Sequence, residues 1–479
     1  MLFNSFEFLI FFPIVTIIYF LLPHRFRWIH LLIASCVFYM FFIPYYIVIL
    51  FVTIIIDYFA GMWIERSDGR KKKIYLWGSI ISTCLVLFVF KYYNFFIGNF
   101  NELSQLIGWN YSLDLLGIIL PIGLSFHTFQ SLSYVIEVYR GNQKAETHFG
   151  IYSLYVMFYP QLVAGPIERP QNVLHQFYEK HKLNYQDVSA GMKLVVWGLF
   201  KKVVIADNVS GLVDVVYANP EQMSWQWLLI GSYLFAIQIY CDFSGYSDMA
   251  IGTARVMGYR LMENFNTPYI SNSIREFWSR WHISLSTWFR DYVYIPLGGN
   301  RVSRLKRNIN LLIVFAVSGF WHGANWTYII WGALHGVYNV VENGLKKFRW
   351  FNAYLETTVR TKKWLGAFIL FQFVVLGWIF FRAASVQDAF AVIGGIFTGQ
   401  LSSWVPPDEI MTFGYWALAF KLGLVLVFMA SDLIIHRLTR GVFDGATSHL
   451  FRLSFYAYLA ALILLIGFWG DVEFIYFQF

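Results

Sequence analysis

The chain has 479 residues, of which 58% are hydrophobic, 21% are aromatic and only 13% carry a charge. Soluble domains carry about 25% charged residues, so this composition excludes a soluble globular protein, a disordered chain, a coiled coil and a collagen-like chain. The 36 Lys and Arg residues outnumber the 28 Asp and Glu residues, which gives a net charge of +8. Cytoplasmic loops of membrane proteins typically carry such a surplus of Lys and Arg, so we expect a lipid bilayer and no nucleic acid as partner. These figures predict an all-α polytopic membrane protein with one integral-membrane domain over residues 1–479.

Apolar segments that approach the length of a membrane span, about 20 residues, follow one another along most of the chain. In chain order they cover residues 6–22, 31–64, 74–97, 115–138, 151–164, 190–206, 225–240, 309–341, 364–381, 415–435 and 453–469. The first has no basic leading region and no cleavage site, so we expect a retained helix and not a signal peptide. Segment 31–64 is either one long tilted helix or two short helices broken at Pro44. In total the hydropathy predicts about ten or eleven crossings.

Basic clusters at 71–73, 301–307 and 346–363 predict the cytoplasmic side of the membrane. The last two clusters flank segment 309–341, and they lie on the same side only if the chain crosses an even number of times between them. We therefore predict a short hairpin or re-entrant pair with its midpoint at WHGANW, residues 321–326. One long helix with one cluster outside is the alternative.

Motifs of soluble enzymes are missing from the sequence: it has no Walker A loop, no HExxH helix and no GxSxG elbow. The cysteines Cys36, Cys84 and Cys241 stand in apolar surroundings without metal-ligand spacing. We expect them to be small core residues, and we expect no metal site and no bound cofactor.

His322 is the most informative residue, because ionisable side chains in an apolar segment usually face a cavity or a partner. On a helix, the small residues Ser318, Gly319, Gly323 and Ala324 surround it and would leave room for a substrate beside the imidazole. A neutral histidine hydrogen-bonded to a neighbouring helix is an equally good interpretation from these residues alone.

Residues 277–301, FWSRWHISLSTWFRDYVYIPLGGNR, form the second notable stretch. Read as one helix, they place four aromatic residues and one leucine on a narrow stripe, which predicts an amphipathic helix lying along the membrane interface. The stripe consists of Trp278, Trp281, Leu285, Trp288 and Tyr292. His282 falls at the edge of this stripe, where it would point into a cavity or pack against tryptophan, and the residues alone favour packing.

Three further signals are weaker. His127 and His335 lie in apolar helices and are expected to be satisfied core histidines. The polar residues of CDFSGYSDMAIG line a cavity or form a buried hydrogen-bond network, and we favour the network because serine and carboxylate side chains satisfy one another. They are Asp242, Ser244, Ser247 and Asp248.

Two stretches, RWHISLSTWFRDYVYIPLGGNR (280–301) and GFWHGANWTYIIWGALHG (319–336), resemble the membrane-bound O-acyltransferase superfamily. The match is closest to the bacterial branch that contains the membrane subunit of alginate O-acetylation. YPQLVAGPIERP (159–170) and YCDFSGYSDMAIG (240–252) are similar to further motifs of that branch. The resemblance covers most of the chain, is densest over 121–340 and extends to the tail only in its hydropathy.

The resemblance implies a helical fold around a central tunnel, in which a cytoplasmic thioester meets an acceptor from the outer side. It makes His322 the invariant catalytic histidine and His282 the second signature position. It also implies acetyl-coenzyme A as acyl donor, a secreted polysaccharide or cell-wall polymer as acceptor, an extracytoplasmic SGNH-type partner and a bacterial inner-membrane location.

Simple chemistry supports this interpretation, because a neutral imidazole is suited to removing the proton of an attacking hydroxyl. Trp321 and Asn325 are candidate donors to the developing oxyanion. Because arginine matches phosphate geometry, Arg301, Arg304 and Arg307 are candidate donor-binding residues; alternatively, they only set the topology. A different class of function, a transporter or flippase of acyl groups or lipid-linked glycans, would also use intramembrane His and Asp, although no inverted repeat is visible.

Overall fold

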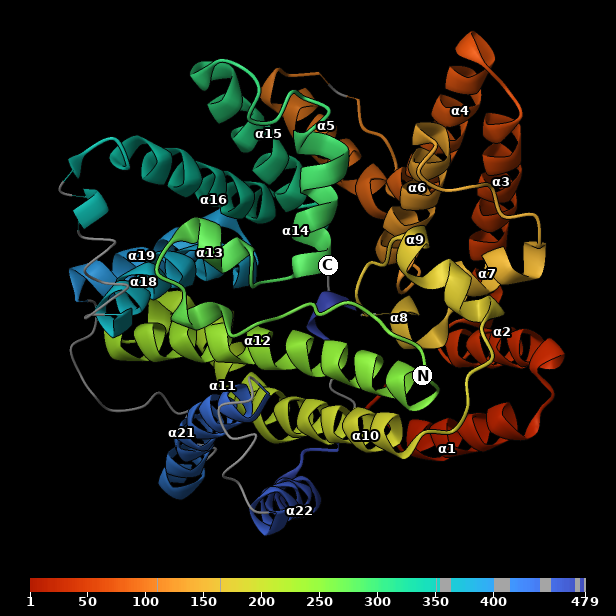
Figure 1. Cartoon of the computed structure of the whole chain (residues 1–479). Helices are drawn as coiled ribbons and strands as arrows, with labels where there is room; N and C mark the ends of the chain where they lie inside the picture. The colour runs from red at the N-terminus through yellow and green to blue at the C-terminus, as the bar shows by residue number, and fades with distance from the viewer. Residues whose placement is uncertain are drawn as a thin grey trace. The chain divides into compact units, whose positions relative to one another are not determined.

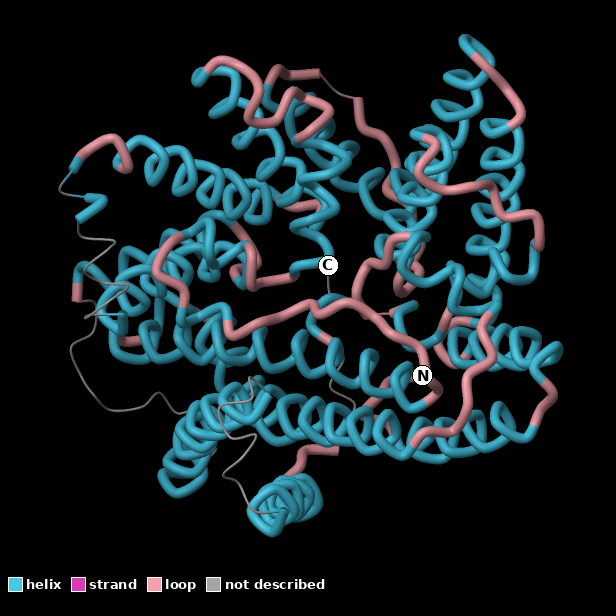
Figure 2. The backbone as a smooth tube through the Cα atoms, in the orientation of Figure 1, coloured by secondary structure: helices cyan, strands magenta, loops and turns pink. Residues whose placement is uncertain are grey.

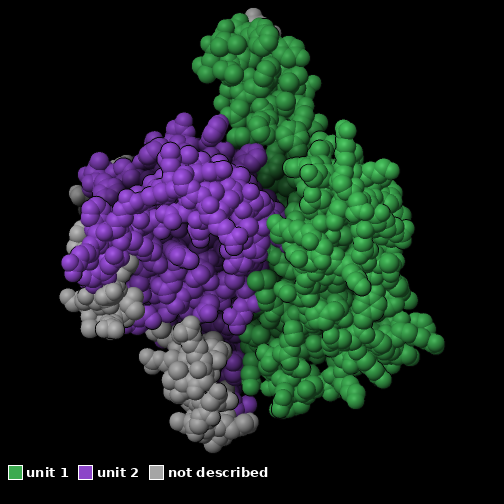
Figure 3. Space-filling view, turned by 45° about the horizontal axis from the view of Figure 1, so that its top comes forward, with its two compact units in different colours: residues 1–195, 247–262 green, residues 196–246, 263–479 purple. Residues whose placement is uncertain are grey.

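The computed structural model describes residues 1–109, 111–163, 165–349, 351–353, 363–399, 414–439, 449–469 and 474–477. All regular secondary structure in these ranges is helical, which confirms the all-α prediction (Figures 1 and 2). The chain forms two compact units, unit 1 with residues 1–195 and 247–262 and unit 2 with residues 196–246 and 263–479 (Figure 3). The single domain over residues 1–479 stays a prediction.

Unit 1 contains the N-terminal helices, which pack around a buried cluster of Tyr39, Tyr46, Leu50 and Leu162. Its elements are α1 (Phe6–Leu21), α2 (His24–Met40), η1 (Pro44–Tyr46), α3 (Ile47–Glu65), α4 (Gly69–Leu87), η2 (Phe88–Tyr92), α5 (Tyr93–Leu106), α6 (Leu124–Arg140), α7 (Phe149–Met157), α8 (Tyr159–Leu162), α9 (Pro170–Val173), η3 (Leu174–Tyr178) and most of α10 (Tyr185–Leu199).

Unit 2 has an aromatic interior in which the Trp378 ring lies 4.9 Å from Trp281 and 5.7 Å from Trp331, measured between ring centroids. Its elements are η4 (Phe200–Ala206), α11 (Asp207–Ala218), η5 (Pro220–Gln222), the first part of α12 (Trp225–Val256), η6 (Pro268–Ile270), α13 (Ile274–Trp278), α14 (Ile283–Phe289), η7 (Arg290–Tyr294), α15 (Arg304–His322), α16 (Trp326–Leu345), α18 (Lys363–Arg382), α19 (Val386–Thr398), α21 (Gly414–Thr439), α22 (His449–Ile466) and η8 (Ile475–Phe477).

Membrane character is visible in the lengths and in the outer faces of the helices. Within the described ranges, four helical segments are long and apolar enough to cross a membrane: Pro44–Glu65, Gly69–Leu106, Trp225–Val256 and Lys363–Arg382. Large apolar side chains such as Leu21, Trp77 and Ile81 are exposed, as contact with lipid chains requires. The count of ten or eleven crossings stays a prediction.

The chain breaks at Pro44, so segment 31–64 is two helices. Ile43, the residue before the proline, is extended with φ −131° and ψ 101°, because a proline ring disfavours the helical conformation of its predecessor. The two-helix alternative is therefore confirmed.

Two predicted spans are wrong in their bounds. Segment 115–138 is helical only from Leu124, because the residues before it are extended and are held by asparagines of α5: Asn94 exchanges two hydrogen bonds of 2.8 and 2.9 Å with the backbone of Leu116. Segment 151–164 breaks at Phe158 into α7 and the short α8, with Pro160 in the first turn of α8. Residue 164 lies outside the described residues, as do 350 and 354–362 of the third basic cluster.

Helices α15 and α16 form the predicted hairpin, and the single-helix alternative is wrong (Figure 1). Their backbones approach so closely that a Cβ atom on Gly319 would lie 2.3 Å from the carbonyl oxygen of Tyr328. A Cβ atom on Gly332 would likewise lie 2.2 Å from the carbonyl oxygen of Phe315. Since the helices run in opposite directions, the basic residues before α15 and after α16 lie at the same end of the hairpin.

Candidate active site

His322 is the last residue of α15 and is 3% exposed. Its Nδ1 lies 2.6 Å from the carbonyl oxygen of Ser318, one turn earlier in the same helix. A carbonyl oxygen only accepts hydrogen bonds, so Nδ1 carries the proton, and the lone pair of the neutral ring is on Nε2. This backbone contact fixes the tautomer in which Nε2 acts as a base.

The glycines beside His322 do not provide substrate space, contrary to our expectation. The side-chain position of Gly323 is filled by the ring of Tyr328, whose nearest atom would lie 2.1 Å from an added Cβ atom. Gly319 is filled by the backbone of the same residue, as described for the hairpin. These small residues allow α16 to pack against α15, so the space beside the imidazole must come from other residues.

The predicted continuous helix, from residue 277 to its expected end at the PLGG turn of residues 296–299, is wrong. The structure has α13 up to Trp278, α14 from Ile283 and a π-helical turn from Arg290, with His282 between the two helices at φ 45° and ψ 55°. A left-handed conformation is uncommon for a residue with a side chain and costs on the order of 1–3 kcal/mol. His282 is therefore not at the edge of an interfacial stripe but is fully buried at the start of α14.

Asn264 holds His282 in this conformation. The Oδ1 atom of Asn264 accepts hydrogen bonds from the amide and hydroxyl of Ser284, at 3.3 and 2.9 Å, and lies 3.1 Å from His282 Nδ1. Because an amide N–H only donates, this atom is the oxygen of Asn264, so His282 Nδ1 also carries a proton. Burial, aided by nearby His322, holds the pKa of His282 well below its usual range. His282 is thus a neutral imidazole with its lone pair on Nε2.

The two histidines share one aromatic cluster in unit 2. The ring of Phe243 lies 4.6 Å from His282 and 4.3 Å from Tyr476, and Tyr476 lies 5.9 Å from His322, all between ring centroids. Trp331 also packs against His322, with 4.8 Å between the ring centroids. The structure therefore brings the two predicted histidines to one site, to which Tyr476 and Asn264 were not assigned from the sequence.

A cavity of about 660 Å³ lies among α13, α14, η7, α15 and α16. Arg275, Arg290 and Arg307 line it, and so does Ser318, whose carbonyl oxygen accepts the proton of His322. The cavity therefore extends from a group of arginines to the helical turn that carries His322.

The predicted donor arginines separate in the structure. Arg307 lines the cavity, whereas Arg301 and Arg304 are exposed and do not belong to its lining. The sequence interpretation missed Arg275 and Arg290. The signal that points to them is their place in the sequence: Arg290 lies in the 277–301 stretch that contains His282, and Arg275 lies two residues before that stretch.

The two candidate oxyanion residues have different surroundings. Trp321 is 6% exposed, and its ring lies 5.0 Å from that of His322. Asn325 caps α16: its Oδ1 accepts from the Thr327 amide at 3.1 Å, and its Nδ2 donates to the Ala384 carbonyl at 3.2 Å. The cap explains an asparagine at this turn, and the oxyanion role of both residues stays a prediction.

Asp242 and Ser244 are buried and hydrogen-bonded, but their partners are lysines and not each other, as the sequence had led us to expect. Lys202 lies between two carboxylates, 2.7 Å from Asp207 and 2.8 Å from Asp242, and Lys201 donates to Ser244 at 2.7 Å. His335 is also a core residue, which accepts a hydrogen bond of 3.3 Å from Trp278 at Nδ1. In unit 1, His127 is buried beside the hydroxyl of Thr53.

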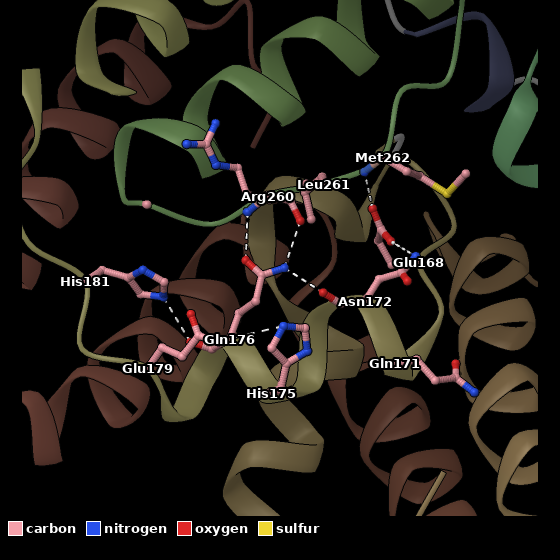
Figure 4. A pocket seen from close by; sticks show the side chains of 11 residues that line it. Glu168, Gln171, Asn172, His175, Gln176, Glu179, His181, Arg260, Leu261 and Met262 are labelled. Carbon is pink, nitrogen blue, oxygen red and sulfur yellow. Dashed lines mark hydrogen bonds and ion pairs between the residues drawn. The ribbon is translucent and has the colours of Figure 1, made fainter. Parts of the chain in front are cut away.

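A second cavity, of about 600 Å³, lies in unit 1 beside the GPIERP stretch (Figure 4). Glu168 is fully buried there and accepts hydrogen bonds from the Met262 amide at 2.5 Å and the Asn172 side chain at 3.2 Å. Gln176 similarly exchanges hydrogen bonds of 2.8 and 2.9 Å with the backbone of Arg260. These contacts tie residues 168–176 to the backbone of residues 260–262. In the described ranges, no three His, Cys, Asp or Glu side chains are placed to hold a metal ion.

Comparison with known proteins gives a consistent result. The model of the MBOAT, membrane-bound O-acyltransferase family, matches residues 147–385. A Pseudomonas aeruginosa protein named "Probable alginate O-acetylase" is 42% identical over 426 residues, which cover 88% of this chain and 76% of that protein. A peptidoglycan O-acetyltransferase of Helicobacter pylori is 37% identical over 76% of this chain and 73% of its own length. A teichoic acid D-alanyltransferase of Bacillus subtilis is 30% identical over 54% of this chain and 68% of its own length.

These matches extend well beyond the stretches that first indicated the resemblance, and they confirm the acyltransferase interpretation over that of a transporter. The chain belongs to the membrane-bound O-acyltransferase family, and it is an O-acyltransferase of the membrane.

Proposed function

We propose that this O-acyltransferase transfers an acetyl group from acetyl-coenzyme A, on the cytoplasmic side of a bacterial inner membrane, to a hydroxyl on the outer side. The acceptor is a secreted polysaccharide or cell-wall polymer, or an extracytoplasmic SGNH-type partner that completes the transfer. The names of the relatives support an acetyl group and a surface polymer, since they include alginate and peptidoglycan O-acetylation.

In this proposal His322 is the general base. The observation that carries it is the 2.6 Å contact between His322 Nδ1 and the Ser318 carbonyl, which places the lone pair on Nε2. Nε2 removes the proton of the attacking hydroxyl while the hydroxyl oxygen bonds to the thioester carbonyl carbon. The C–S bond of the tetrahedral intermediate then breaks, the proton passes from Nε2 to the sulfur, and coenzyme A leaves as the thiol. General-base assistance of this kind contributes about 10²–10⁴ to the rate. His282, neutral and oriented by Asn264, acts on the same site as a second polar group.

The cavity lined by Arg275, Arg290 and Arg307 is the proposed donor site. Coenzyme A carries several phosphate charges, and guanidinium groups bind phosphate in a bidentate manner. Ser318 lines the same cavity and its carbonyl oxygen contacts His322, so we propose that a donor bound at the arginines reaches toward the base. Trp321 and Asn325 are the proposed donors to the tetrahedral oxyanion.

The test is thioester turnover by the purified protein in lipid nanodiscs, with acetyl-coenzyme A and a surface polymer supplied. We expect the wild type to release coenzyme A and the His322→Ala variant to lose this activity. His335→Ala is the matched control, since it removes another buried histidine of the same hairpin and should keep its activity per folded molecule. Polymer transport without release of coenzyme A would contradict the proposal, as would turnover that does not depend on His322.

A further inference from the structure

The buried charges of unit 2 are an unusual way to fill a protein interior. Lys202, Asp207 and Asp242 are each at most 5% exposed. Removing charges from water costs several kcal/mol per ion, and apolar side chains in place of a buried ion pair are often equally stable or more stable. Stability alone is therefore a poor explanation of this cluster.

The two carboxylates of the cluster differ in one contact. Both bind Lys202 through one oxygen, but the second oxygen of Asp242 accepts a hydrogen bond of 2.7 Å from the backbone amide of Ile475. Ile475 begins η8, close to the C-terminus, and lies 233 residues from Asp242 in the sequence. Among the described residues, Asp207 has no hydrogen bond to this C-terminal segment. Of the two carboxylates, Asp242 is therefore the one that joins the charged cluster to residues 474–477.

The segment joined in this way lies in the aromatic cluster of the active site. Phe474 packs 4.4 Å from Tyr246, and Tyr476 packs 4.3 Å from Phe243 and 5.9 Å from His322, between ring centroids. Phe243 directly follows Asp242 on α12, so the hydrogen bond and the ring contacts hold the segment at neighbouring points.

From these contacts we propose that Asp242 is a positioning residue, which docks residues 474–477 against His322 through one carboxylate oxygen while Lys202 binds the other. A hydrogen bond from an amide to a charged carboxylate is about twice as strong as one between neutral groups. The consequence for acyl transfer rests on the proposed function, but the docking itself does not.

Asp242→Ala and Asp207→Ala form a matched pair, because each leaves Lys202 with one carboxylate partner and only the first removes the acceptor for Ile475. The direct measurement is hydrogen–deuterium exchange of the peptide that contains residues 474–477, in the full-length protein in nanodiscs. We expect Asp242→Ala to speed exchange at Ile475 by about tenfold or more and Asp207→Ala to leave it near the wild-type rate. Asp242→Asn, which keeps an acceptor oxygen, should restore most of the protection.

Acyl transfer gives a second measurement. Asp242→Ala should lower kcat and leave the KM for acetyl-coenzyme A unchanged, because the cavity lined by arginines is not altered. Once residues 474–479 are removed, the chains with and without Asp242→Ala should have the same kcat. Equal exchange in the two alanine variants, or a full effect of Asp242→Ala in the truncated chain, would overturn the docking role. If the exchange pattern holds but the wild type transfers no acetyl group, the proposed function fails and the docking stands.

Discussion

The carbonyl oxygen of Ser318 lies 2.6 Å from Nδ1 of His322, one helical turn away, and Ser318 also lines the cavity that contains three arginines. One turn of α15 therefore has two tasks. It fixes the tautomer of the histidine through a backbone hydrogen bond, and it forms the wall of the space where a thioester would be bound. Any backbone distortion of this turn would affect both.

Removing the side chain of Asn264 should disturb His282 without touching the substrate. We expect Asn264→Ala to lower kcat by about tenfold, since His282 Nδ1 loses its acceptor and the left-handed backbone loses its support. Asn264→Asp keeps an oxygen acceptor and should retain more activity. Steady-state kinetics of the two variants and of His282→Ala check this. Wild-type rates in all three variants would show that His282 only packs against its neighbours.

The arginines allow a comparison between cavity and surface. Arg307→Gln should raise the KM for acetyl-coenzyme A, whereas Arg301→Gln and Arg304→Gln, outside the cavity lining, should leave it unchanged. Added salt should raise the KM of the wild type more than that of Arg307→Gln, because phosphate contacts open to water are screened. Kinetics per inserted molecule measure this. Equal behaviour of the three variants would make these arginines topology signals only.

Asn325 can be tested for its two roles separately. Asn325→Ala removes the cap of α16 and should cost about 1 kcal/mol of stability, while Asn325→Asp keeps the cap acceptor and loses only the hydrogen bond to the Ala384 carbonyl. Only the amide group can donate to an oxyanion, so a lower kcat in the otherwise stable Asn325→Asp variant would support that role. Thermal unfolding and kcat, measured on the same preparations, distinguish the two. Unchanged kcat in Asn325→Asp would leave Asn325 a helix cap.

Glu168 should make stability depend on pH. Burial raises its pKa from 4.5 to about 7, so the folded protein keeps this proton to higher pH than the unfolded chain does. Its contribution is therefore fully present below pH 4.5 and is lost as the pH rises through about 7, a change of about 3 kcal/mol. Glu168→Gln cannot ionise, so its Tm should fall less between pH 5 and 8 than that of the wild type. Parallel Tm curves for the two proteins would contradict this prediction.

The hairpin predicts that its two ends face the same side of the membrane. Single cysteines at Ser303, before α15, and Lys347, after α16, should be labelled by an impermeant thiol reagent from the cytoplasmic side only. The background should carry Cys84→Ser, because only Cys241 of the three cysteines is buried as expected, Cys36 is partly exposed and Cys84 is exposed. Labelling of the two positions from opposite sides would contradict the orientation derived from the basic clusters.

The sequence by itself determined that the chain is a membrane protein and which family it belongs to. It also singled out His282 and His322 as candidate site residues. Hydropathy reveals helices because a bilayer demands long apolar segments whose backbone groups are satisfied internally. It also determined the α15–α16 hairpin, since the basic residues at both ends of 309–341 require an even number of crossings.

Only the tertiary structure decided how these residues meet. The stripe pattern of 277–301 fits one helix. The chain nevertheless breaks at His282, because Asn264, 18 residues earlier in the sequence, supplies the hydrogen bonds that support the left-handed backbone of His282. Periodicity carries no information on such a side-chain contact. Arg307 lines the cavity, whereas Arg301 and Arg304 do not, and the spacing of the three arginines in the sequence does not reveal this difference. The docking of Ile475 on Asp242 joins residues 233 positions apart, so local sequence could not reveal it.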